Sequence, residues 1–351
     1  MIARADLPIP QSWYAVAFTD ELPPGSLLTR QLAGGDIIVF RTRGGAVGVS
    51  DPFCPHLGAH FGFGGMVEGE ELRCPFHGFR FNTNGACTAT GYGTKPPPRA
   101  HLRMWPCREL NGIIFAWYDP HGAAPHWEPV PLDAAGWTPL IHTAFSLRDH
   151  VQETVENSVD IGHFGIVHGY SDVRVLRELV IDGPRFRVCY AARRPMPVFG
   201  RLGAQVSFAF DLCISGLGYS LVTTTVEGMD IQTRLFILAT PTEPGRIALR
   251  LALSLREIIR PERIHPLAAV APRPLLNHVV ARVILASLAH DVRQDIPIWE
   301  HKRYLERPAL AEGDGPIGRF RQWTRQFYLQ PEAEAGRPEV NTVEKLQCFS
   351  N

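Results

Sequence analysis

The sequence has no excess of charge of either sign, because its 351 residues include 35 Lys and Arg and 35 Asp and Glu. A balanced charge gives no long-range attraction to a polyanion, so no nucleic-acid partner is predicted. Long hydrophobic runs are also missing, since no stretch reaches the roughly 18 uninterrupted apolar residues of a membrane span. The first eight residues lack the apolar segment of a signal peptide. We therefore expect a cytoplasmic protein without stable membrane insertion.

Cysteines are few, and their positions do not suggest disulfide pairing. There are seven, an odd number with no regular spacing, which is typical of a reducing compartment. A dinucleotide-binding fingerprint is missing as well. The glycines at positions 62, 64 and 65 do not open a βαβ unit, so they do not predict a nucleotide loop. The chain is therefore not predicted to bind a dinucleotide itself.

Two short motifs each combine one cysteine with one histidine. Residues 53–58 read Phe-Cys-Pro-His-Leu-Gly and residues 73–78 read Arg-Cys-Pro-Phe-His-Gly. Two thiolates and two imidazoles suit a [2Fe–2S] cluster in which histidines replace cysteines on one iron. A structural zinc site accepts the same ligands, but zinc fingers usually keep both cysteines in one half of the motif. The neighbouring Pro and Gly residues favour tight loops that enclose a cluster.

A second pattern, at residues 157–168, places two histidines after a carboxylate. Non-haem Fe(II) oxygenases hold iron with two histidines and one carboxylate and leave the other positions open for O₂ and substrate. The histidines, His163 and His168, are five residues apart, which does not suit one straight helix. We therefore expect a helix end or a bulge between them. Asn157, Asp160 and His163 share one helical face, and the alternative is a surface helix with scattered histidines.

The pair of Cys-His motifs is followed in the sequence by the histidine pattern of residues 157–168. With its motifs in this order, the chain resembles the terminal oxygenase component of Rieske non-haem iron oxygenases, from about residue 13 to about residue 328. The resemblance implies that Cys54 and Cys74 hold the inner iron of the cluster and that His56 and His77 hold the outer iron. It also implies a homotrimer that receives electrons from a ferredoxin or flavin reductase component.

The same resemblance assigns the second pattern. His163 and His168 would be ligands of a mononuclear Fe(II), and Asn157 would lie near that iron. Asp160 would link a cluster histidine of the neighbouring subunit to a histidine of the mononuclear iron. A carboxylate that accepts N–H bonds from two metal-bound imidazoles fixes both rings. Such a link between subunits requires a head-to-tail ring.

The third ligand of the mononuclear iron must be a distant carboxylate. Relatives place it just before an apolar stretch that ends in Trp, which favours Asp295 in the segment 291–301. Asp291, one helical turn earlier, is the alternative, and either could instead be a solvated acid or a helix cap. Seven apolar residues repeat at helical spacing before Asp295. They predict a core-facing helix, and the alternatives are a wall of a substrate tunnel or an entrance helix that takes a lipid from a membrane. They are Leu275, Leu276, Val279, Val280, Val283, Ile284 and Leu288.

Residues 295–302, 313–317 and 319–328 look like the steroid- and sterol-oxidising branch, with its 3-ketosteroid 9α-hydroxylases, cholesterol 7-desaturases and sterol C-4 demethylases. This likeness implies a monooxygenase of lipid metabolism that hydroxylates, desaturates or removes a C-4 methyl group. An aromatic or other small hydrophobic substrate is the alternative within the same chemistry. The alternative of another class is a Rieske electron-transfer protein without its own oxygenase site. We expect Trp323, Phe327 and Tyr328 to pack between subunits.

The expected fold is α+β. Short strands separated by glycine turns over residues 27–118 predict an all-β cluster domain. Four prolines in residues 120–131 predict the crossing to a second domain. Strands at about 184–194, 204–214, 219–228, 231–240 and 246–257 predict one antiparallel sheet covered by helices. The expected domains are a Rieske domain (1–130), a catalytic mononuclear-iron domain (131–330) and a C-terminal tail (331–351).

Overall fold

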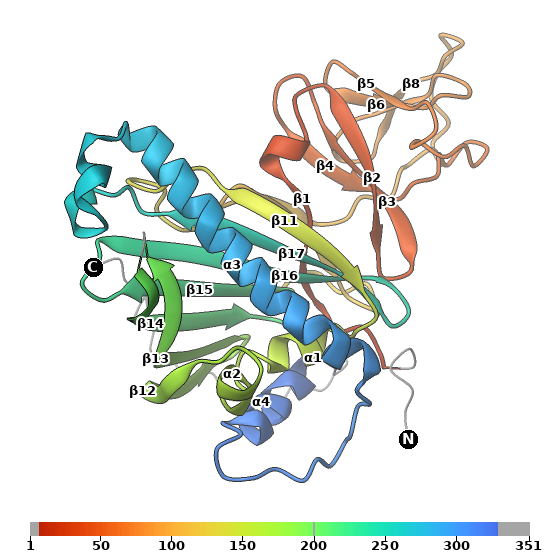
Figure 1. The fold of residues 1–351 in the computed structure, drawn as a ribbon. Coiled ribbons are helices and arrows are strands. Elements are labelled where there is room, and N and C mark those ends of the chain that lie inside the picture. The colour runs from red at the N-terminus through yellow and green to blue at the C-terminus, as the bar shows by residue number, and fades with distance from the viewer. Residues whose placement is uncertain (1–6, 199–200, 329–351) are drawn as a thin grey trace.

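The computed structural model describes residues 7–198 and 201–328, so the predicted tail lies outside the described residues. Its N-terminal part consists of short antiparallel strands in three small sheets (Figure 1). The first sheet has the order β1 (Ser12–Phe18), β10 (Ile113–Tyr118), β9 (Cys107–Leu110), and the second has β2 (Ser26–Leu32), β3 (Gly35–Arg41), β4 (Val47–Ser50). The third contains β5 (Met66–Glu68), β6 (Glu71–Arg73), β7 (Arg80–Phe81) and β8 (Cys87–Ala89).

The second part of the chain is built on one antiparallel sheet of seven strands. The strand order is β11 (Ile141–Leu147), β17 (Arg246–Leu255), β16 (Ile231–Glu243), β15 (Tyr219–Val226), β14 (Arg201–Ser215), β13 (Arg185–Val198), β12 (Ser171–Asp182). All five strands predicted for this region are present. The sequence did not indicate β11 and β12, which form the two edges. The α+β fold class is confirmed.

Helices cover one face of this sheet (Figure 1). They are α1 (Val151–Glu156), α2 (Gly162–Ile166), α3 (Arg273–His301) and α4 (Ile317–Thr324), with short 3₁₀ turns at Thr19–Glu21, Pro261–Arg263, Pro266–Val270 and Arg325–Tyr328. The long α3 crosses the sheet diagonally. By length and composition α3 could also cross a membrane, and it is the one helix of the described residues that could. Core helices satisfy the same criterion, and α3 packs on β17 and β11.

The described residues form two hydrophobic cores. The smaller core lies beneath the loops that carry Cys54 and Cys74, whereas the larger one joins β1 and β10 to the seven-stranded sheet. Trp323 and Phe327 belong to the larger core and are 5 % and 1 % exposed. The expectation that they pack between subunits is therefore wrong, because their own chain already buries them. Tyr328 packs against the same core and donates a hydrogen bond to Gln152 Oε1 at 2.8 Å.

Candidate metal centres

The two Cys-His loops have the same backbone geometry. In the first loop, Cys54 N donates to the carbonyl five residues ahead, and its own carbonyl accepts from Gly58 N at 2.9 Å. In the second, Cys74 N donates to Phe79 O at 2.8 Å, and its carbonyl accepts from Gly78 N at 3.2 Å. Both glycines have positive φ, +75° and +67°, which side chains rarely adopt. Each loop is therefore a tight turn that places one cysteine and one histidine beside those of the other loop.

The side chains of the loops fit a cluster with two different ends. Cys54 and Cys74 are buried, whereas His56 and His77 are half-buried, with ring centroids 4.8 Å apart. The His77 Nδ1 atom is buried and has no hydrogen-bond partner among the described residues. A free imidazole nitrogen in that position is what a metal ligand requires. The cysteines therefore point inward and the histidines outward, as in a [2Fe–2S] cluster with two histidines on its outer iron.

Burial raises the pKa of the Cys54 thiol to about 12. A thiol in so apolar a place would stay protonated unless a metal stabilised its thiolate. The zinc alternative is less compatible with this arrangement, because each loop supplies one thiolate and one imidazole. The pair of loops therefore fits a [2Fe–2S] cluster better than a zinc ion.

The second centre lies where α2 ends. His163 is the second residue of α2, which ends at Ile166, and His168 follows the helix. The expected helix end between the two histidines is thus confirmed. Their rings approach each other edge to face at 5.0 Å. Ending the helix brings together two side chains that a straight helix would point in different directions.

Both histidines are oriented by bonds on the ring nitrogen that faces away from the centre. His163 Nδ1 bonds to the carbonyl of Asp160, and His168 Nδ1 donates to Gln294 Oε1 at 3.0 Å. Bonds of this kind fix the tautomer and leave Nε2 free for a metal. Burial lowers the pKa of His163, which favours the neutral, ligating form. Gln294 could not be identified from the sequence, because a glutamine beside Asp295 carries no motif.

The carboxylate at this centre comes from Asp295 on α3. Ligand atoms of His163, His168 and Asp295 all lie within 4.8 Å of one another, as a facial triad requires. Asp291, the alternative, instead pairs with Arg194 at 2.7 Å and accepts from Tyr170 at 3.0 Å. Three donors of suitable type around one point fit an iron ion.

Asn157 and Asp160 also lie at this centre. Asn157 Nδ2 is 3.1 Å from His163 Nε2 and 3.4 Å from an oxygen of Asp295, so Asn157 contacts two of the three candidate metal ligands. Asp160 Oδ1 accepts from His163 N at 3.3 Å, and its side chain is 34 % exposed. The other carboxylate oxygen of Asp160 has no partner among the described residues. It is thus available to a group outside this chain.

A cavity of about 280 Å³ opens from the mononuclear centre between α3 and the sheet. His163, His168 and Asp295 contribute to its wall, and most of the remaining lining is aliphatic or aromatic. Five of the seven residues in the predicted apolar stripe line it: Val279, Val280, Val283, Ile284 and Leu288. The helix that carries Asp295 therefore also forms one wall of an apolar cavity. Composition and spacing gave no indication of the polar residues Tyr170 and Arg194 in this cavity.

Comparisons with known proteins agree with this architecture. Residues 12–103 match the Rieske [2Fe-2S] domain, and residues 116–328 match the 3-ketosteroid 9alpha-hydroxylase C-terminal domain. A cholesterol 7-desaturase of Bombyx mori is 30 % identical over 92 % of this chain and 70 % of its own length. A 3-ketosteroid-9-alpha-monooxygenase oxygenase component of Rhodococcus rhodochrous is 27 % identical, over 92 % and 84 %.

Solved structures share the fold. Dicamba monooxygenase bound to dicamba aligns with a TM-score of 0.63 and 21 % identity, over 90 % of this chain and 96 % of that one. The NdmA protein of Pseudomonas putida with caffeine aligns with a TM-score of 0.66 and 19 % identity, over 89 % of each chain. The chain therefore belongs to the Rieske oxygenases of the 3-ketosteroid 9alpha-hydroxylase family, oxidoreductases that combine a [2Fe–2S] cluster with a mononuclear iron and receive electrons from a reductase.

Proposed function

We propose that this enzyme oxidises a C–H bond of a steroid or sterol, using O₂ and electrons from a separate NAD(P)H-dependent reductase. The observation that carries the proposal is the position of His163, His168 and Asp295 at an apolar cavity. A rigid hydrocarbon fits such a wall, because its binding depends on apolar contact. The curated relatives named for cholesterol and for 3-ketosteroids support the substrate class.

We propose His163, His168 and Asp295 as the ligands of the mononuclear iron, and Cys54, Cys74, His56 and His77 as those of the cluster. Iron at the three-ligand site would supply the activation of O₂ at its open positions. The protein residues contribute orientation. Gln294 and the Asp160 carbonyl hold the two rings, and the aliphatic wall excludes water from the reacting C–H bond.

We further propose that Asp160 links His163 to a cluster histidine of a neighbouring subunit in a head-to-tail homotrimer. In Figure 1 the small sheet with β5, β6 and β8 lies at one end of the molecule, while α2 lies at the other. Within one chain the two centres are therefore far apart. The carboxylate of Asp160 is half-buried, and one of its oxygens has no partner among the described residues, which supports a link to another chain. Each subunit would use one donor and one acceptor surface, which closes a ring.

The domain boundary near residue 130 stays part of this proposal. It is supported by the prolines of residues 120–131 and by the separate matches to residues 12–103 and 116–328. We also propose a cytoplasmic location. None of the six described cysteines forms a disulfide, which agrees with a reducing compartment.

Product analysis tests the substrate class. The purified enzyme, supplied with NADH and a reductase of this enzyme class, is incubated with a panel of 3-ketosteroids and sterols, and the products are identified by mass spectrometry. We expect oxidation of at least one steroid, and none with the His163→Ala variant. Turnover of small aromatic compounds without turnover of any steroid would contradict the proposed substrate class.

A further inference from the structure

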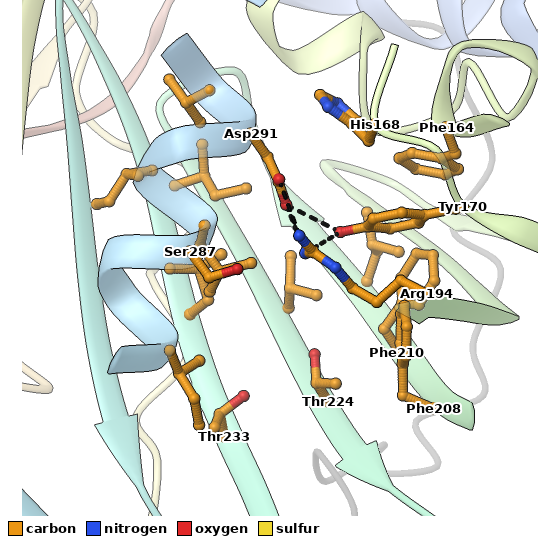
Figure 2. A pocket seen from close by; sticks show the side chains of 18 of the residues that line it. Phe164, His168, Tyr170, Arg194, Phe208, Phe210, Thr224, Thr233, Ser287 and Asp291 are labelled. Atoms are coloured by element: carbon orange, nitrogen blue, oxygen red, sulfur yellow. Dashed lines mark hydrogen bonds and ion pairs between the residues drawn. The ribbon is translucent and has the colours of Figure 1, made fainter. Parts of the chain in front are cut away.

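An ion pair crosses the apolar cavity beside the mononuclear centre. Arg194 on β13 reaches across to Asp291 on α3, with Nη1 at 2.7 Å and Nη2 at 3.1 Å from the two carboxylate oxygens (Figure 2). The hydroxyl of Tyr170 accepts from Arg194 Nη1 at 2.9 Å and donates to Asp291 at 3.0 Å. All three residues line the cavity.

Such a pair is costly in this place. The side chains of Arg194 and Asp291 are only 16 % and 11 % exposed, so both charges have lost most of their hydration. Buried ion pairs often give no more stability than apolar residues of similar volume. The surrounding wall, formed by residues such as Phe208, Phe210 and Leu212, shows that apolar packing is available here. Stability alone therefore does not account for the pair.

Counting the donors of Arg194 shows where a ligand can bind. A guanidinium has five N–H groups in a fixed plane. Nη1 uses both of its protons, on Tyr170 and Asp291, and Nη2 uses one on Asp291. The Nε proton and the second Nη2 proton have no acceptor among the described residues. Arg194 lines the cavity, and its Nε atom is not fully buried.

We propose that the Nε/Nη2 edge of Arg194 is a subsite that binds an uncharged carbonyl oxygen of the hydrophobic substrate. The proposal rests on the function proposed above and deepens it. A carbonyl oxygen has two lone pairs and no proton, so it can accept hydrogen bonds from Nε and Nη2 at the same time. Because Asp291 already neutralises the guanidinium, an uncharged acceptor fits the edge better than a carboxylate does.

The ion pair also ties the subsite to the metal ligands. Asp291 precedes Asp295 by about one turn of α3, and Tyr170 follows His168 by two residues. A carbonyl bound by Arg194 would thus be held in a fixed position relative to His168 and Asp295. The distance between that oxygen and the oxidised carbon would then decide which C–H bond reacts. Arg194 is in this sense a specificity-determining residue.

The test compares the binding of two matched ligands, a 3-ketosteroid and the same steroid without the ketone oxygen, by calorimetric titration of the holoenzyme. Arg194→Lys keeps a charge beside Asp291 but loses the planar pair of donors. We expect it to weaken ketone binding about tenfold, the value of a charge-assisted hydrogen bond, and to change binding of the deoxygenated steroid less than about threefold. The exposed Arg193→Lys is the matched control and should alter neither ligand's affinity.

A double variant, Arg194→Met with Asp291→Asn, removes both charges, so no charge is left buried without a partner. It should show the same selective loss of ketone binding. Equal loss for both steroids, no loss for either, or loss of iron from Arg194→Lys would overturn the subsite. Wild-type enzyme that binds neither steroid would overturn the proposed substrate class together with it. Wild-type enzyme that binds both steroids equally, with unchanged binding in Arg194→Lys, would overturn the subsite alone.

Discussion

His168 and Asp295 face each other at the cavity, with Nε2 of the histidine 3.4 Å from Oδ1 of the carboxylate and both side chains almost fully buried. One residue follows α2 and the other lies on α3, so this contact joins the two segments that form the mononuclear centre. Asp291, on the same helix, is held away from the histidines by Arg194 and Tyr170.

Because Asp295 contacts His168 and Asp291 pairs with Arg194, we predict different effects of substituting the two carboxylates. Asp295→Asn should lower iron affinity at the mononuclear site by more than the 10–100-fold typical of residues outside the ligand set. Asp291→Asn should keep that iron but lower the free energy of unfolding by about 1–3 kcal/mol, because Arg194 loses its charged partner. Iron analysis and thermal unfolding separate the two effects. The assignment of Asp295 would be wrong if Asp291→Asn alone released the iron.

Removing a histidine should separate the two metal centres. His163→Ala deletes one of three ligand atoms at the mononuclear site and touches no residue of the Cys-His loops. We expect the variant to keep the visible absorbance of the cluster while it loses the mononuclear iron and turnover. His290→Ala, an exposed histidine on α3, is the matched control and should behave like wild type. Unchanged iron content in His163→Ala would favour the electron-transfer alternative over an oxygenase.

Asp160→Ala should act on electron transfer and not on metal content. The side chain accepts a bond from the backbone of His163, while the ring of His163 is held by the backbone carbonyl of Asp160, which the substitution keeps. Both metals should therefore remain. Rapid-mixing reduction of the cluster should be normal, whereas substrate oxidation within the first turnover should be almost abolished. Asp182→Ala, which removes an exposed acid on β12, serves as the control. Near-normal turnover in Asp160→Ala would exclude the proposed link.

Much of the large sheet could be predicted from the sequence, because its central strands either alternate apolar and polar residues or are continuously apolar. The edge strand β12 was missed although it contains six apolar residues, because charged residues interrupt them and most of its side chains stay exposed. β1 is buried along its whole length and is as long as β2 and β3, but no glycine turn marks its start, so it was also missed. Burial of these strands depends on contacts distant in the sequence, which local patterns do not contain.

In the candidate site, too, the sequence predicts the residues that lie in local motifs but not those that distant contacts bring together. Cys54, His56, Cys74 and His77 could be recognised because two short motifs contain them entirely. Asp295 needed the likeness to relatives, since the carboxylate comes from a helix far along the chain. The cavity residue Arg194 had no signal at all, because its role arises only where β13 passes opposite α3. Aromatic residues near the C-terminus were misassigned to a subunit contact for a related reason. Their partners, such as the Gly183 carbonyl that accepts from Trp323, lie far away in sequence.

Close packing of glycines around the second Cys-His loop gives a final prediction. A Cβ at Gly91 would lie 2.2 Å from the carbonyl oxygen of His77, so Gly91→Ala must displace the loop that carries this histidine. We expect loss of the visible absorbance of the cluster, with the mononuclear iron retained. Gly93→Ala meets no atom within 4 Å and costs only about 1–2 kcal/mol for its positive φ of 73°. It should keep the cluster, and if both variants lost it equally, backbone strain and not contact with His77 would be the cause.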